Sequence, residues 1–132
     1  MALRVVRFGE PRQPGEGLRI GTVRYLPRGV PKEERSERFF DVWLPELAPS
    51  QELLRSFRAE ADWPAFERAY RKQLGEPAAR HLIELIAALS RRTDIAIGCY
   101  CEDVSRCHRS ILADVLAAAG AELARPLPGA SE

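Results

Sequence analysis

The last third of the chain reads as a helix, a buried strand and a second helix, and this order limits the fold more than any other feature. Residues 76–92, "EPAARHLIELIAALSRR", repeat leucine and isoleucine at helical spacing. Residues 93–101, "TDIAIGCYC", are a short β-rich run between polar residues, which is typical of a buried strand. Residues 105–120 then predict a helix that ends before Gly120. We therefore expect an α/β fold: a small, mainly parallel sheet with helices packed on it.

The N-terminal half supplies further strands. Residues 2–8 alternate in hydrophobicity, and residues 18–25, "LRIGTVRY", do the same. Residues 35–47 fit no single element, and we expect this stretch to bury its apolar side chains against the core. Those side chains are Phe39, Phe40, Val42, Trp43 and Leu44.

Two more helices are expected in the middle of the chain. Ser50 is a typical N-terminal cap for the first of these helices. Asp62 is a typical N-terminal cap for the second, and Gly75 should end it. The apolar stripe of the second helix consists of Trp63, Phe66, Tyr70 and Leu74. In the helix over 76–92, the side chains that recur at helical spacing are Leu82, Leu85, Ile86 and Leu89. With 132 residues, we expect one domain over 1–125 and a frayed tail over 126–132.

Composition narrows the classes of function. No apolar run reaches the roughly 20 residues that a membrane span needs, and "MALRVVRFG" lacks a signal-peptide pattern. The three cysteines fit no disulfide scaffold, so we expect a cytoplasmic protein with reduced thiols. The net charge of +1 gives no global attraction to nucleic acid, although only two of the 20 basic residues are lysine.

The stretch "GCYCEDVSRCHRS", residues 98–110, holds all three cysteines and one of the two histidines. It should run from the carboxyl end of a strand into a helix start, where α/β proteins bind ligands and where a thiol pKa falls. Cys107 is thus a candidate nucleophile and His108 its base or orienting group. Cys101 and Arg109 are candidate ligand-binding residues.

Each of these residues also has a structural interpretation. His108 precedes Ile111 and Leu112 at spacings of three and four, so it lies on the apolar helix face. Cys99 is expected to be a small core side chain. Arg109 should point away from the apolar face and meet either an anion or solvent.

Other uses of the thiols are less consistent with the spacing. Cys99, Cys101, Cys107 and His108 are suitable zinc ligands, but they lack the usual C-x₂₋₄-C spacing, so no metal and no cofactor is predicted. A disulfide between Cys101 and Cys107 is a further alternative. Neighbouring helical residues point about 100° apart, which argues against a simple Cys107–His108 dyad.

A second candidate site is "TVRYLPRGVPKE", residues 22–33. Arg24 and Arg28 flank a proline-bearing turn, and Lys32 follows, so the loop presents cations that suit a carboxylate or phosphate. Alternatively, Arg28 pairs with Asp41 or Glu46 and only fastens the loop.

Three segments carry a family resemblance: "GLRIGTVRYLPRGVPKEE", "DVWLPELAPSQELLRSF" and "WPAFERAYRKQL". In this order they resemble the YeaO-like proteins of family 488 among the domains of unknown function. Two places depart from that pattern. Tyr25-Leu26 replaces Leu-Trp, and Cys107-His108 stands where the YeaO-like ending has asparagine-histidine. In this second place the chain resembles the C-H-R ending of the other branch of the family. The resemblance implies a compact α/β fold with the two candidate segments facing one pocket, and implies no particular reaction.

The leading hypothesis is a pocket for a small anionic or nucleotide-like molecule between the Arg24–Lys32 loop and the Cys99–Arg109 turn. One alternative is nucleic-acid binding through the arginines, which requires the 19 acidic residues to lie on another face. Another is a protein-partner module that exposes Phe39, Phe40 and Trp43. Neither the oligomeric state nor catalysis follows from the sequence.

Overall fold

The computed structural model describes residues 2–9, 12, 14–26, 29–34, 39–99 and 108–124. In this part of the chain four strands form one parallel sheet in the order β1-β4-β2-β3. The strands are β1 (Leu3–Arg7), β2 (Leu18–Gly21), β3 (Val42–Trp43) and β4 (Ile95–Cys99). The helices are α2 (Gln51–Glu60), α3 (Trp63–Leu74), α4 (Pro77–Ser90) and α5 (His108–Ala118), with 3₁₀ turns η1 (Lys32–Glu34) and η2 (Pro45–Leu47). The predicted α/β fold with a parallel sheet is confirmed.

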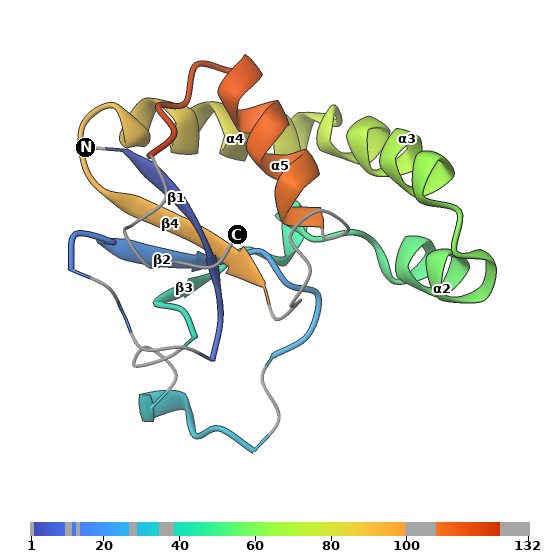
Figure 1. The fold of residues 1–132 in the computed structure, drawn as a ribbon, viewed down its shortest axis with the longest axis horizontal. Helices are drawn as coiled ribbons and strands as arrows, with labels where there is room; N and C mark the ends of the chain where they lie inside the picture. Colours follow the sequence, from blue (N-terminus) through green and yellow to red (C-terminus); the bar gives the residue numbers. More distant parts are fainter. Residues whose placement is uncertain are drawn as a thin grey trace.

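The main core lies between the sheet and the helices α3, α4 and α5 (Figure 1). Leu3, Ile20, Ile95 and Ile97 come from the strands, and all are at most 4% exposed. Each such side chain contributes roughly 1.5–3 kcal/mol on burial. The helices supply the facing side chains, which are Phe66, Tyr70, Leu74, Ala79, Ile83, Ile86, Ile111, Leu112 and Leu116.

The opposite face of the sheet is covered by aromatic rings instead of helices. The ring centres of Phe8 and Phe40 lie 5.6 Å apart, and the two rings pack over two glycines of the sheet. A Cβ atom on Gly21 would lie 2.6 Å from the Phe40 ring, and one on Gly98 would lie 2.8 Å from the Phe8 ring. Cys99 belongs to this second cluster, so the predictions that Cys99 and Phe40 are core residues are confirmed.

The same face contains a buried ion pair that the sequence did not indicate. Arg19 and Glu16 are 1% and 2% exposed, and the guanidinium donates to both carboxylate oxygens, at 2.6 and 3.1 Å. Two parallel charge-assisted hydrogen bonds offset part of the desolvation of both groups. The pair fastens the loop before β2 to the centre of the sheet.

Helix ends follow the predicted capping. The Ser50 hydroxyl accepts from the Leu53 backbone N–H at 3.1 Å, and the Asp62 carboxylate accepts from Ala65 N–H at 3.1 Å. Gly75 follows α3 as expected. The residue after α2 is Ala61, which has a left-handed φ of 53°.

The predicted helix over 76–92 is confirmed as α4, but two of its regularly spaced leucines do not lie on its buried face. Leu85 is 55% exposed and Leu89 is 36% exposed. α4 instead buries a face that alternates large and small side chains, including Ile83, Ile86 and Ala87. Small side chains let a helix lie closer to its neighbours, so the leucine repeat alone misjudged the rotation of this helix.

The prediction that Val42 and Trp43 are buried is also wrong. They are 42% and 37% exposed, because β3 is a two-residue strand at the edge of the sheet. Trp43 lies over the adjacent segment, where its indole N–H donates to the Val23 carbonyl at 2.7 Å.

No helix in the described part of the chain has the length and apolar character to cross a membrane. Residues 125–132 lie outside the described residues, so the proposed tail boundary stays a prediction.

Candidate functional site

The two predicted segments begin at neighbouring strand ends. β2 and β4 pair in parallel, with Ile20 opposite Ile97 and Gly21 opposite Gly98. The segment that starts at Thr22 and the segment that follows Cys99 therefore leave the sheet at the same edge. This is the carboxyl edge, where open parallel sheets bind ligands.

Thr22 joins the two strand ends directly. It is fully buried, and both its backbone N–H and its hydroxyl donate to the Gly98 carbonyl, at 3.3 and 3.0 Å. The hydroxyl adds a contact beyond the last regular rung of the ladder. Thr22 thus holds the start of the arginine-bearing loop beside the end of β4.

His108, the first residue of α5, lies above the end of β2. Its ring is 9% exposed, and its Nε2 atom lies 2.5 Å from the Thr22 carbonyl oxygen. A carbonyl oxygen only accepts, so Nε2 carries the proton and donates. Nε2 is therefore occupied by a backbone carbonyl and is not placed to accept a proton from a thiol.

Tyr70 packs against the His108 ring from α3. The two ring centres are 5.8 Å apart in an edge-on arrangement. Tyr70 is fully buried, and its hydroxyl donates to the Leu47 carbonyl in η2. Because Tyr70 is anchored at both ends, it limits the orientations open to the imidazole.

Arg109 extends to β1, the strand that flanks β4 on the side away from β2. Its side chain is 1% exposed, and Nη1 donates to the Val6 carbonyl of β1 at 2.7 Å. The expectation that Arg109 points away from the apolar face is therefore wrong: its long stem follows the buried side to an outer strand. His108 is hydrogen-bonded at the end of β2 and Arg109 is hydrogen-bonded to β1. The first turn of α5 therefore connects the two strands that flank β4.

Arg24 has a fastening role. Its guanidinium donates to the Pro49 carbonyl at 3.1 Å and to the Ala48 carbonyl at 3.0 Å, at the junction before α2. The predicted alternative partner of Arg28, Asp41, is bound by Arg12 at 2.6 Å and accepts from the backbone N–H of Arg19.

Several predicted site residues lie outside the described residues: Arg28, Cys101, Cys107 and the side chain of Lys32. The zinc and disulfide alternatives fall there too. The described part thus brings together His108, Arg109 and Thr22 at one edge, with Arg24 on the neighbouring segment.

The sequence includes Thr22 in the candidate segment 22–33 but does not indicate its hydrogen bonds to β4, and it indicates Tyr70 only as part of an apolar helix stripe. Their polar atoms were the available signal, because a buried hydroxyl needs a partner. The identity of that partner depends on tertiary structure.

Comparisons with known proteins agree with the family resemblance of the three sequence segments. Residues 3–120 match the family model DUF488-N3a, described as "Active DUF488-N3 subclade". The chain is 28% identical over 119 residues to "Uncharacterized protein YeaO" of Escherichia coli K12, a match that covers 88% of this chain and 97% of the relative. It is 29% identical over 115 residues to "Uncharacterized protein Rv3073c" of Mycobacterium tuberculosis, covering 86% and 92%. No solved structure matches the chain significantly.

Proposed function

The chain belongs to the DUF488 family, and we propose that it binds a small anionic or nucleotide-like molecule at the carboxyl edge of its sheet. The observation that carries this proposal is the parallel pairing of β2 and β4. It makes the Arg24–Lys32 loop and the Cys99–Arg109 turn neighbours at their origin. A loop with Arg28 and Lys32 would then face the helix start that follows Cys107.

The geometry at this edge supports binding of negative charge. The first turn of α5 carries the positive end of the helix dipole, which favours an anion beside it. His108 and Arg109 are hydrogen-bonded to strand carbonyls, so they act as positioning residues that hold this turn in place. In this proposal Arg28, Lys32, Cys101 and Cys107 are the residues that contact the ligand.

The description of the matched family model calls its subclade "Active" and names no reaction. Cys107 is the candidate nucleophile, since a thiol beside a helix N-terminus has a lowered pKa. In this proposal His108 contributes through the position of the turn, which its hydrogen bond to the Thr22 carbonyl fixes.

The test is calorimetric titration with adenosine monophosphate, with adenosine as the uncharged control. We expect binding of the phosphate-bearing molecule alone. Arg28→Ala should weaken it at least tenfold, about the worth of one charge-assisted contact. The matched control is Arg55→Ala on the exposed surface of α2, which should bind as the parent chain does. Equal binding of adenosine, or an unaffected Arg28→Ala variant, would contradict the proposal.

A second variant tests the thiol separately. Cys107→Ser keeps nearly the same volume, so the fold should persist while the nucleotide binds more weakly. Unchanged affinity would remove Cys107 from the site.

Retention on heparin that fades with salt would instead favour the nucleic-acid alternative.

A further inference from the structure

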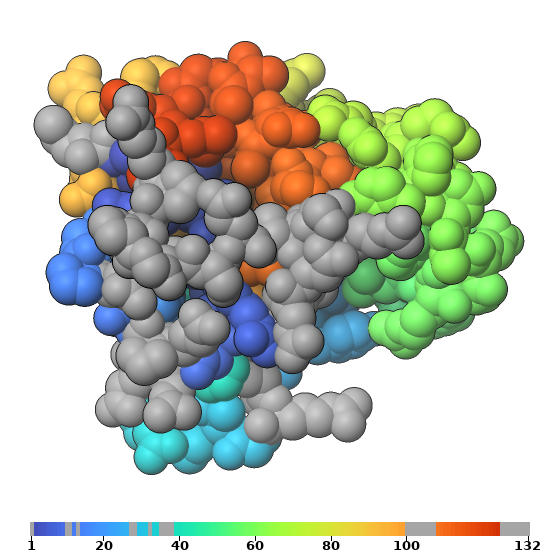
Figure 2. All heavy atoms as spheres, in the orientation of Figure 1, coloured from blue at the N-terminus to red at the C-terminus, as the bar shows by residue number. Residues whose placement is uncertain are grey.

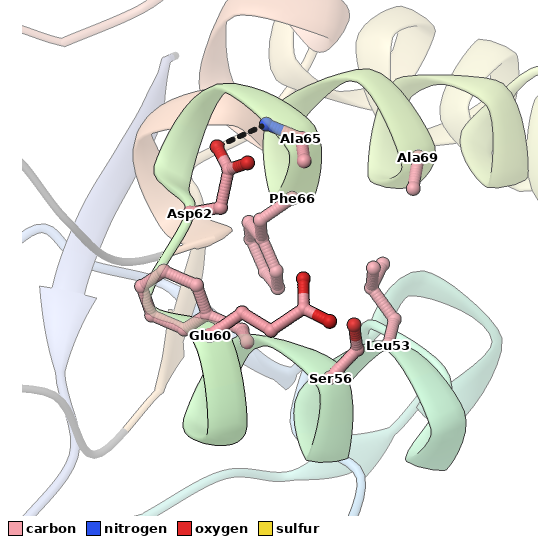
Figure 3. A pocket seen from close by; sticks show the side chains of 8 residues that line it. Leu53, Ser56, Glu60, Asp62, Ala65, Phe66 and Ala69 are labelled. Atoms are coloured by element: carbon pink, nitrogen blue, oxygen red, sulfur yellow. Dashed lines mark hydrogen bonds between the residues drawn. The ribbon is translucent and has the colours of Figure 1, made fainter.

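A groove between α2 and α3 lies away from the carboxyl edge of the sheet and takes no part in the proposed site. It encloses a cavity of about 230 Å³. Leu53, Phe57, Ala65 and Phe66 form its walls, while Glu60 and Asp62 lie at its rim (Figure 3). Pockets for drug-sized ligands are about 300 Å³ or more, so this volume suits one large side chain.

The groove exists because α2 is only partly covered. α2 buries none of its residues fully, although Leu53 and Phe57 pack partly against the core. In Figure 2 the green atoms of α2 and α3 form one end of the molecule. The apolar side of α2 is therefore available to a second protein segment.

The rim of the groove is negatively charged. Figure 3 shows the Glu60 carboxylate turned over the cavity towards Ser56. Within the described part of the chain, Glu60 makes no ion pair. Asp62 adds a second carboxylate, with one oxygen accepting from Ala65 N–H as the cap of α3. Apolar walls beneath an unengaged carboxylate match a side chain with an apolar stem and a cationic head.

We propose that this groove binds one arginine side chain of a partner protein. The half-buried Phe57 ring would contact the stem and the flat face of the guanidinium, while Phe66, which is 4% exposed, closes the floor of the groove. Glu60 would accept two parallel hydrogen bonds from the guanidinium fork. Arginine fits better than lysine because it stacks on rings and binds a carboxylate bidentately.

The test uses the full chain and the peptide acetyl-Leu-Arg-Leu-amide. The control peptide carries citrulline, which has the shape of arginine without the charge. In ¹H–¹⁵N spectra, the arginine peptide at millimolar concentration should shift amide signals of α2 and α3, and the citrulline peptide should not. No shifts in these helices, or equal shifts with citrulline, would overturn the proposal.

Matched variants assign the effect to one carboxylate. Glu60→Gln should weaken the arginine peptide about fivefold, the upper range for an exposed ion pair. Glu52→Gln, on the same helix but outside the groove, should change affinity little. Circular dichroism checks that both variants keep their helices. Equal affinities of the two variants would overturn the proposal.

A second copy of this arginine-rich chain is the competing occupant. Sedimentation velocity of the parent protein distinguishes the two. A monomer that binds the arginine peptide supports a foreign partner. A dimer that dissociates on Glu60→Gln would overturn the foreign-partner proposal and assign the groove to self-association.

Discussion

At the scale of single residues, the first turn of α5 is held by two side chains that leave it in different directions. His108 donates to the Thr22 carbonyl at the end of β2, and Arg109 donates to the Val6 carbonyl in β1. Both acceptors are carbonyls near the carboxyl ends of the parallel strands. The start of α5 is thereby positioned relative to β1 and the end of β2.

His108→Ala should lower the free energy of unfolding by about 1–3 kcal/mol, because the Thr22 carbonyl loses its donor in a buried place. His108→Gln should recover much of this loss, since its amide nitrogen can occupy the position of Nε2. Urea denaturation of the three proteins measures both effects. If Gln and Ala destabilise equally, the hydrogen bond to Thr22 does not contribute as described.

Gly17 is a position where the backbone excludes every other residue. Its φ is 75°, and a Cβ atom there would lie 1.9 Å from the Asp94 carbonyl oxygen, just before β4. Gly17→Ala should therefore cost at least about 3 kcal/mol in unfolding free energy, from strain and from displaced backbone together.

Gly9→Ala is the matched control for this prediction. Gly9 has a φ of 103°, but a Cβ atom there would meet no described atom within 4 Å. It should cost only the conformational strain, about 1–2 kcal/mol. Similar costs for both variants, measured by chemical denaturation, would show that the approach of Gly17 to Asp94 is unimportant.

At the scale of elements, α2 depends on its ends more than the other helices do, because it buries no residue fully. Ser50 caps its start, and Ala61 ends it in the left-handed region. An alanine in that region is strained, whereas glycine adopts it readily.

Ala61→Gly should therefore stabilise the protein, by about 0.5–1 kcal/mol. The same substitution two residues earlier, Ala59→Gly, should destabilise by about 0.5–1 kcal/mol, because Ala59 is an exposed position inside the helix. Thermal or urea unfolding of the pair tests the opposite signs. Two changes of the same sign would contradict the left-handed end of α2.

Elements with local signals were predictable from the sequence. Caps at Ser50 and Asp62, the glycine after α3 and the buried strand β4 all depend on neighbours in the chain. The rotation of α4 and the exposure of β3 were not predictable. They depend on which elements end up at the edge of the sheet, and Leu85 and Trp43 carry no local mark of that outcome.

At the scale of the whole molecule, strand order determines where a site can form. β4 comes late in the sequence yet lies between β1 and β2. This insertion brings the end of β4 beside the end of β2, where Thr22 is hydrogen-bonded to Gly98 across a sequence separation of 76 residues. The sequence predicted both segments as candidates because each has a distinctive composition. Their shared edge follows from the strand order, and the hydrogen bonds of Thr22, Tyr70 and Arg109 could be assigned only in three dimensions.

The most direct test of the central proposal is chemical-shift mapping of the ¹⁵N-labelled protein with adenosine monophosphate and, separately, adenosine. The account predicts that the monophosphate shifts amide signals of Thr22, Val23, His108 and Arg109, at the ends of β2 and the start of α5, while adenosine leaves them in place. Signals that stay unchanged there, or that move only in α2 and α3, would contradict an anion site at the carboxyl edge of the sheet.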